Sequence, residues 1–294
     1  MRRNNMRAIN YSFLIVTLLV TCADASAQLT LRQGAAPDVQ DNSSQPARFG
    51  YAKSTDTSSA ALALALKYTW PTRFVGSRKN IVGLWAPYVA VGIEDDDTTK
   101  TDRKSVEIGA EATFGNIFQD ANVFLISTSL GKDRDRSADT EGSYGKISAL
   151  LVSKYLRHGL GYMDGKWGLF VRPRAGLHYI DTNKTADPVL VPTGTAKGAM
   201  AEISLDFFPN FSDRTRITYL GKVTRDFSTT GNRIKQTYRK HALKAEYLLY
   251  DYAAPPAAGQ PRFSLIVERA KGSDPLDGQY KDVQRTGVYL GIML

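Results

Sequence analysis

The chain has 294 residues and a formal net charge of +9, a length that suits one large domain or two small ones. Its single cysteine, Cys22, lies in the N-terminal segment. A disulfide scaffold, a thiol enzyme and a cysteine metal site are therefore excluded for the rest of the chain. A basic balance fits nucleic acid, anionic lipid or an anionic solute as a partner.

Residues 1–27 are predicted to be a secretory signal peptide. Arg2, Arg3 and Arg7 precede an apolar run over residues 13–20, and Ala25-Ser26-Ala27 follows it. A basic start, a short apolar run and small residues at a cleavage site are typical of such signals, and the run is too short to cross a bilayer as a helix. We expect cleavage after Ala27.

A lipoprotein signal cleaved before Cys22 is the alternative, although Thr21 is a poor match to the small residue expected there. Cleavage after Ala27 removes three arginines and one aspartate, which lowers the net charge from +9 to +7. Export makes nucleic acid the least suitable of the three partners. Residues 28–46 are polar and rich in Gly, Asn, Ser and Pro, and this composition predicts a flexible segment.

Alternation of apolar and polar residues dominates from residue 60 to the end, and it predicts β-strands. The run from Trp167 to Tyr179, for example, alternates with Arg172, Arg174 and His178. Most runs have about 9–13 residues, the length that a tilted strand needs to cross a bilayer. The twelve predicted strands cover residues 47–53, 60–70, 81–93, 104–114, 121–132, 143–156, 167–180, 198–208, 214–226, 236–249, 261–270 and 283–294.

These strands predict an all-β fold, an antiparallel up-and-down transmembrane β-barrel of about twelve strands. The first strand is weak, and the short stretch at residues 29–32 is an alternative to it, because single-chain barrels of bacteria have even strand numbers. Counts of ten and fourteen stay open. A soluble periplasmic β-protein is a further alternative.

With both termini in the periplasm, the connections over residues 94–103, 133–142, 181–197 and 271–282 face outside, and their charged and small residues suit solvated loops. Aromatic residues gather beside the other set of connections. We interpret them as a girdle at the membrane interface. The girdle candidates are Tyr68, Trp70, Phe114, Tyr155, Trp167, Phe207, Phe208, Tyr247 and Tyr250.

The last strand resembles the C-terminal insertion signal of Gram-negative outer-membrane β-barrel proteins. Val288, Leu290, Ile292 and Leu294 alternate outward, with Gly287, Tyr289, Gly291 and Met293 inward. Leu294 departs from the Phe or Trp usual at that end. The resemblance is to the class rather than to one family, and it implies the outer membrane as location, the barrel-insertion machinery as a partner, and contact with outer-membrane lipid and lipopolysaccharide.

Inward-facing charges form a ladder on the middle strands if simple hairpin registers hold. Arg172 then faces Asp206, Asp206 faces Arg216, and Arg216 faces Glu246. Charge is expected inside because a lipid-facing charge costs about 2–4 kcal/mol at the bilayer midplane. A purely structural interpretation is that inward charges pair with each other in a narrow barrel.

The same wall carries a basic surplus that could select anions. It adds Arg174, Arg214, Lys222, Lys240 and Lys244 against only Glu202, which leaves +4 on this wall. Glu107 and Glu111 face inward on the fourth strand, so a basic wall would oppose a more acidic one. Such a field favours anions in a pore, although an occluded lumen filled with salt bridges would show the same pattern.

Evidence for an enzyme is weak. His178 is predicted to point inward near Glu202 and Asp206, and Ser204 is the only nearby nucleophile that it could activate. The His-x-Ser arrangement of barrel phospholipases is missing at all three histidines. We expect no catalytic residues, no metal site and no cofactor.

The first functional hypothesis is a porin-like channel of narrow bore that passes small anionic solutes or an anionic oligosaccharide. The second is a barrel that anchors or assembles an envelope complex through a periplasmic or surface protein. A lipid-modifying enzyme is the third.

Overall fold

The computed structural model describes residues 28–32, 47–54, 57–77, 80–96, 98, 101–115, 122–159, 167–189, 191–250, 260–277 and 279–293. The predicted signal peptide, and most of the segment over residues 28–46, lie outside the described residues. No helix in the described part is both long and apolar enough to cross a membrane.

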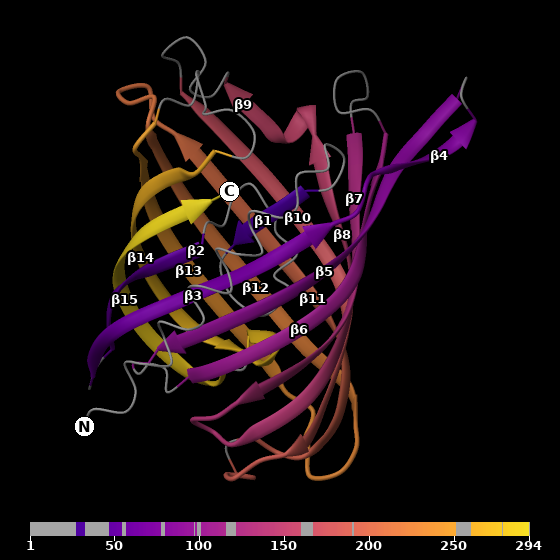
Figure 1. The fold of residues 1–294 in the computed structure, drawn as a ribbon, viewed down its shortest axis with the longest axis vertical. Coiled ribbons are helices and arrows are strands. Elements are labelled where there is room, and N and C mark those ends of the chain that lie inside the picture. Colours follow the sequence, from indigo (N-terminus) through magenta and orange to yellow (C-terminus); the bar gives the residue numbers. More distant parts are fainter. Residues whose placement is uncertain are drawn as a thin grey trace.

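Twelve antiparallel strands close into a barrel (Figure 1). Each strand pairs with the next along the chain, β3 pairs with β5, β8 pairs with β10, and β15 closes the ring on β2. The barrel strands are β2 (Ala47–Ser54), β3 (Ser58–Thr69), β5 (Asn80–Asp96), β6 (Thr101–Phe114), β7 (Asn122–Asp135), β8 (Thr140–Ser153), β10 (Gly168–Lys184), β11 (Gly194–Phe208), β12 (Thr215–Thr229), β13 (Thr237–Leu248), β14 (Arg262–Asp274) and β15 (Gln279–Met293).

Three short strands prolong barrel strands at one end of the molecule. β1 (Gln28–Arg32) pairs with β3 beyond the end of β2, β4 (Arg73–Ser77) pairs with β5 beyond the end of β3, and β9 (Arg157–Gly159) pairs with β10 beyond β8. We call the end where β15 finishes the inner end and the opposite end the outer end, which points down in Figure 1.

All twelve predicted strands are present, and the strand number of twelve is confirmed. The strands are longer at the outer end than predicted: β6 begins at Thr101 rather than at residue 104, and β15 begins at Gln279 rather than at residue 283. The outer ends carry charged side chains on both faces, so the apolar half of the alternation disappears there although the backbone stays extended.

The polar N-terminal segment is partly structured, which corrects the expectation of a flexible stretch over residues 28–46. Gln28–Arg32 forms β1, because Leu29 and Leu31 continue a strand pattern opposite Tyr68 and Leu66 of β3. β1 and β2 therefore occupy successive parts of the same edge of β3. The sequence offered them as alternatives for the first strand, and the structure contains both.

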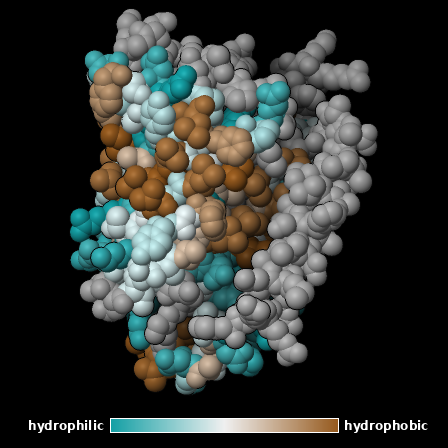
Figure 2. Space-filling model, turned by 60° about the vertical axis from the view of Figure 1, so that its left-hand side comes forward, coloured by the Kyte–Doolittle hydropathy of each residue, from teal (hydrophilic) through white to brown (hydrophobic). Residues whose placement is uncertain are grey.

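The outer wall of the barrel is apolar, whereas the inner wall is polar and charged. Large side chains such as Leu130, Leu177 and Leu243 are more than half exposed on the outside, as lipid contact requires. Figure 2 shows one side of this wall, where hydrophobic side chains gather across the middle and hydrophilic ones lie above and below. The buried apolar clusters are small; one consists of Ala52, Ala61, Ile266 and Tyr289.

The predicted aromatic girdle lies at the inner end, with one exception. Trp70, Tyr155, Trp167 and Tyr247 are between 44% and 69% exposed on the outside. Phe208 instead faces inward, is buried, and lies 5.1 Å from the ring of Phe170 between centroids. Successive residues of a strand point to opposite faces, so Phe207 and Phe208 cannot both reach the interface.

Candidate functional site

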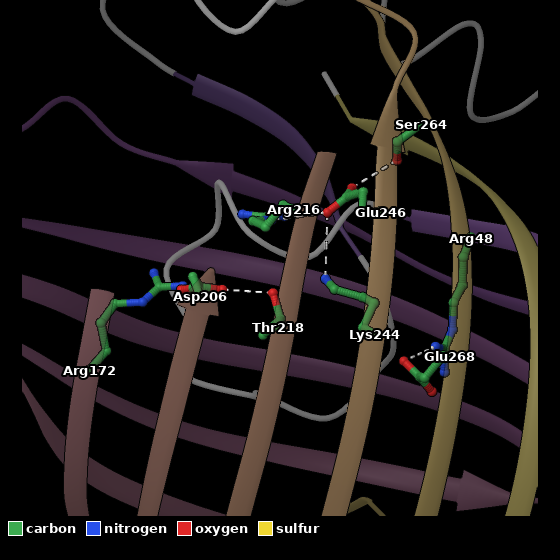
Figure 3. Close-up of polar contacts among 9 residues, drawn as sticks. All are labelled: Arg48, Arg172, Asp206, Arg216, Thr218, Lys244, Glu246, Ser264 and Glu268. Atoms are coloured by element: carbon green, nitrogen blue, oxygen red, sulfur yellow. Dashed lines mark hydrogen bonds and ion pairs between the residues drawn. The ribbon is translucent and has the colours of Figure 1, made fainter. Parts of the chain in front are cut away.

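The inner wall over β10–β14 carries the predicted charge ladder in a modified form (Figure 3). Arg172 forms an ion pair with Asp206, and Arg216 forms one with Glu246. Asp206 accepts a hydrogen bond from Thr218 Oγ1 at 2.7 Å, and Glu246 accepts one from Ser264 Oγ at 2.8 Å. Between the two ion pairs and beyond the second one, the ladder thus consists of hydrogen bonds from hydroxyl groups to the carboxylates.

The strand registers explain the difference from the prediction. Arg216 lies opposite Glu246, as the simple hairpin predicts. Asp206 lies opposite Thr218 and not opposite Arg216, so that step of the ladder is wrong. Arg172 lies opposite Ser204 and reaches Asp206 diagonally. In both cases the observed register differs from the predicted one by two residues, so every side chain stays on the predicted face of the sheet. The alternation of apolar and polar residues cannot distinguish such registers, and turn geometry decides between them.

A second group of ion pairs lies farther toward the outer end on the same wall. Arg174 Nη1 lies 3.0 Å from Glu202 Oε1. Lys222 forms a buried ion pair with Asp274 of β14. The sequence placed Asp274 in a loop, because the predicted strand ended at residue 270. The extended outer part of β14 therefore supplies a partner for one of the supposedly surplus lysines.

His178 also belongs to this group, and its partner differs from the predicted one. Its Nε2 lies 3.1 Å from Asp226 Oδ1, across β11. His178 lies opposite Gly198, whereas Ser204 lies opposite Arg172, six residues farther along β11, or roughly 20 Å at the usual rise of a strand. The histidine and the proposed nucleophile are therefore not brought together.

A third group of ion pairs, which the sequence did not reveal, joins β2 to β14 and joins β15 to β14 and β5. Arg48 Nη1 lies 2.8 Å from Glu268 Oε2, and Arg285 reaches both Glu268 at 3.4 Å and Asp96 at 3.0 Å. The Arg48 guanidinium also lies over the Tyr289 ring, 4.5 Å from its centroid. Glu268 and Arg285 occupy inward-facing positions in the alternation of their strands, so the sequence could have identified them as lumen charges. Asp96 could not be found this way, since its acidic neighbours predict a loop.

The acidic side chains on the other side of the lumen also have partners. Glu107 accepts hydrogen bonds from Tyr88 and Tyr144, the latter at 3.4 Å. Glu111 forms an ion pair with Lys67, which is fully buried. The predicted contrast between a basic and an acidic wall is therefore reduced on both sides.

The remaining selectivity candidates are Arg214, Lys240 and Lys244. Arg214 is exposed and lies in the turn before β12, outside the strand that the sequence predicted for it. The turn between β11 and β12 extends to this residue, so the strand begins one position later than predicted. Lys240 is half-buried opposite Lys222. Lys244 faces inward, 3.8 Å from Glu246 Oε2. The predicted surplus of +4 omitted Asp226 and Asp274, which face the same space.

The connection between β14 and β15 folds into the outer mouth. Leu276 is buried there, and its carbonyl accepts hydrogen bonds from Nη1 and Nη2 of Arg103 at 3.3 Å. Arg233 donates to the Tyr280 hydroxyl at 3.1 Å and to the Gly194 carbonyl at 2.9 Å. A cavity of about 40 Å³ remains beside Arg103 and Leu276, which is room for a few water molecules.

The predicted insertion signal lies on β15 with the expected parity. Val288 and Leu290 are exposed on the outer wall, and Tyr289 is buried inside. Leu294 lies outside the described residues. Within the described part of the chain, no cluster of three or more His, Cys, Asp or Glu side chains could hold a metal ion.

No family model matches the chain, and no curated protein matches it. Solved structures similar to it include the translocator domain of the autotransporter NalP from Neisseria meningitidis (11% identity, 98% of this chain and 95% of that chain, TM-score 0.37). A second is the β domain of the Bordetella autotransporter BrkA, with 10% identity over 90% of this chain and 98% of that chain, and a TM-score of 0.41. A third is the outer-membrane expressed OmpT of Vibrio cholerae, with 8% identity over 92% of this chain and 99% of that chain, and a TM-score of 0.37. The likeness is one of fold alone. The closed ring, apolar outside and charged inside, is the fold of an outer-membrane β-barrel.

Proposed function

We propose that this protein is an outer-membrane channel of narrow bore that favours small anions. The observation that carries the proposal is the course of the ion pairs along the wall near the inner end of the barrel. Arg172–Asp206 and Arg216–Glu246 each join neighbouring strands, so the charges follow the wall as a polar lining. A twelve-stranded ring is wider than eight-stranded barrels, which side chains fill, and narrower than open porins of sixteen strands.

The anion preference rests on a small group of cations in the outer half of the lumen. Lys222 and Lys240 lie opposite each other on β12 and β13. Lys222 is buried beside Asp274, whereas Lys240 is only half-buried and is therefore the more accessible of the two to a passing solute. Cationic side chains along a pore lower the barrier for anions. Lys240 is therefore the residue whose charge should matter most for selectivity.

The test is single-channel recording in planar bilayers under a salt gradient. Wild-type protein should give steady openings with a reversal potential on the anion side. Lys240→Glu should move that potential toward cations, and Lys240→Gln should move it about half as far. Lys132→Glu is the matched control, since Lys132 is exposed on the outer wall of β7 and should leave selectivity unchanged.

The connection that folds into the outer mouth favours a second candidate, a barrel that anchors a periplasmic or surface partner. The hydrogen bonds from Arg103 to the Leu276 carbonyl hold the β14–β15 connection inside the mouth. A folded barrel that stays silent in the bilayer, and that co-purifies with one envelope protein, would overturn the channel and support the anchor.

A further inference from the structure

Five basic side chains face outward near the outer end of β11–β14. Each of them is exposed, and each has the parity of the lipid-facing wall, next to an inward residue such as Thr224, Tyr238 or Ala270. We call this group the outer basic patch. Its members are Lys197, Arg225, Arg239, Arg269 and Lys271.

The strand registers make the patch continuous. Arg225 lies opposite Thr237, so it is the diagonal neighbour of Arg239. Lys271 lies opposite His241, so it is the diagonal neighbour of Arg239 on the other side. Diagonal neighbours in an antiparallel pair are about 7–8 Å apart. Cations at this spacing repel each other unless negative charge lies among them.

No acidic side chain in the described part of the chain forms an ion pair with this group. No ion pair or hydrogen bond joins the side chains of the outer basic patch to another described residue. The opposite side of the outer rim differs: Arg134 of β7 forms an ion pair with Glu141 of β8 at 3.1 Å. The side chains of the outer basic patch therefore lack an ion pair of the kind that Arg134 makes on the other side of the rim.

An apolar surface borders the patch on the side of the bilayer. Val223, Leu243 and Val267 face outward and are 40%, 54% and 50% exposed. Leu243 lies opposite Arg269, and Val223 lies opposite Arg239. Cations thus lie where a membrane-facing strand leaves the apolar layer, which is the depth of lipid headgroups.

We propose that the outer basic patch binds the phosphate groups of an anionic lipid, with its acyl chains lying on Val223, Leu243 and Val267. The charge complementarity selects the headgroup, and the adjoining apolar wall selects a lipid over a soluble anion. An outer-leaflet glycolipid with two phosphates and several acyl chains matches a patch of five cations. This site lies on the outer wall and does not depend on whether the lumen conducts.

The test is native mass spectrometry of the folded barrel released from micelles that contain equal amounts of phosphatidylcholine and of lipid A, a bisphosphorylated glycolipid. Wild-type protein should retain lipid A in preference to phosphatidylcholine. Arg225→Gln, Arg239→Gln and Lys271→Gln together should reduce that retention at least about tenfold, because each basic residue near an anionic surface contributes several-fold.

The matched control removes the same charge from the other side of the rim, with Lys104→Gln, Lys132→Gln and Arg134→Gln combined. It should retain lipid A like the wild type. Equal loss in both triple variants, or equal retention of phosphatidylcholine by the wild type, would overturn the proposal. Excess inorganic phosphate should displace little lipid A; full displacement would show that only the phosphate is recognised and would overturn the role of the apolar wall. Unchanged urea unfolding confirms that the variants are folded.

Discussion

The inner and outer walls of this barrel carry charge in different ways. On the inner wall, buried charges such as Glu246 and Glu268 lie beside opposite charges from neighbouring strands. On the outer wall, the middle is apolar, and cations such as Arg239 and Arg269 are confined to the outer end. The difference follows from the surroundings, since a buried charge has only the protein to neutralise it, whereas a charge at the rim has water and lipid headgroups.

The largest effect is expected from breaking an inner pair. Glu246→Gln leaves Arg216 and Lys244 close together without their shared carboxylate. Removing one partner of a buried pair costs about 3–5 kcal/mol. We expect a loss of this size in the free energy of unfolding, measured by urea titration of the barrel in phospholipid vesicles.

The double variant Arg216→Met with Glu246→Gln is the control for this prediction. It removes one uncompensated cation and should recover part of the lost stability. If the free energy of unfolding of Glu246→Gln is within about 0.5 kcal/mol of the wild-type value, the range of ordinary surface changes, water reaches the pair. Charges on the inner wall would then be solvated like those at the rim.

An intermediate effect is expected from moving a cation along the outer wall. Val267 lies two residues from Arg269 on the same face of β14 and closer to the middle of the apolar layer. The swap variant Val267→Arg with Arg269→Val keeps the composition of the chain. Its cost should approach about 2–4 kcal/mol, the value for arginine at the bilayer midplane, in the same unfolding assay.

Arg269→Val alone should change stability little, because a charge near the interface costs about 0–1 kcal/mol. Equal stability of the swap and of this single variant would mean that Val267 and Arg269 have the same surroundings. The boundary between the apolar wall and the outer basic patch would then be misplaced.

The fold was predictable because the bilayer imposes a simple rule on each strand. Alternation revealed all twelve barrel strands, since one face of every strand meets lipid. Beyond the apolar layer the alternation is lost, and the strand ends could not be predicted. Asp96 and Asp274 lie on such strand extensions, and the sequence placed both in loops. These acids pair with Arg285 and Lys222, so the error in strand length became an error in lumen charge.

The site was less predictable than the fold because ion pairs depend on register. Parity placed Arg216 and Glu246 on the inner wall, and their pairing followed from the simple hairpin. A slip of two residues preserves parity and exchanges partners, as it does for Asp206 and Thr218. Pairs that span a strand, such as His178 with Asp226 across β11, depend on two registers at once and could not be derived from alternation.

The smallest effect is expected from an exposed pair at the outer loops. Lys184 Nζ lies 2.8 Å from Asp139 Oδ1, and this hydrogen bond holds the pKa of the Asp139 carboxyl below its usual range. A lowered carboxyl pKa stabilises the folded state above the unfolded pKa of about 3.9, and the contribution is lost as the pH falls through the lower folded value. Both side chains are about half exposed, so water and salt screen the pair. Lys184→Met should therefore shift the urea midpoint only slightly at neutral pH, and the shift should disappear in high salt or below the folded pKa of Asp139. A loss comparable with that of Glu246→Gln would contradict the contrast between paired charges inside the barrel and charges at its rim.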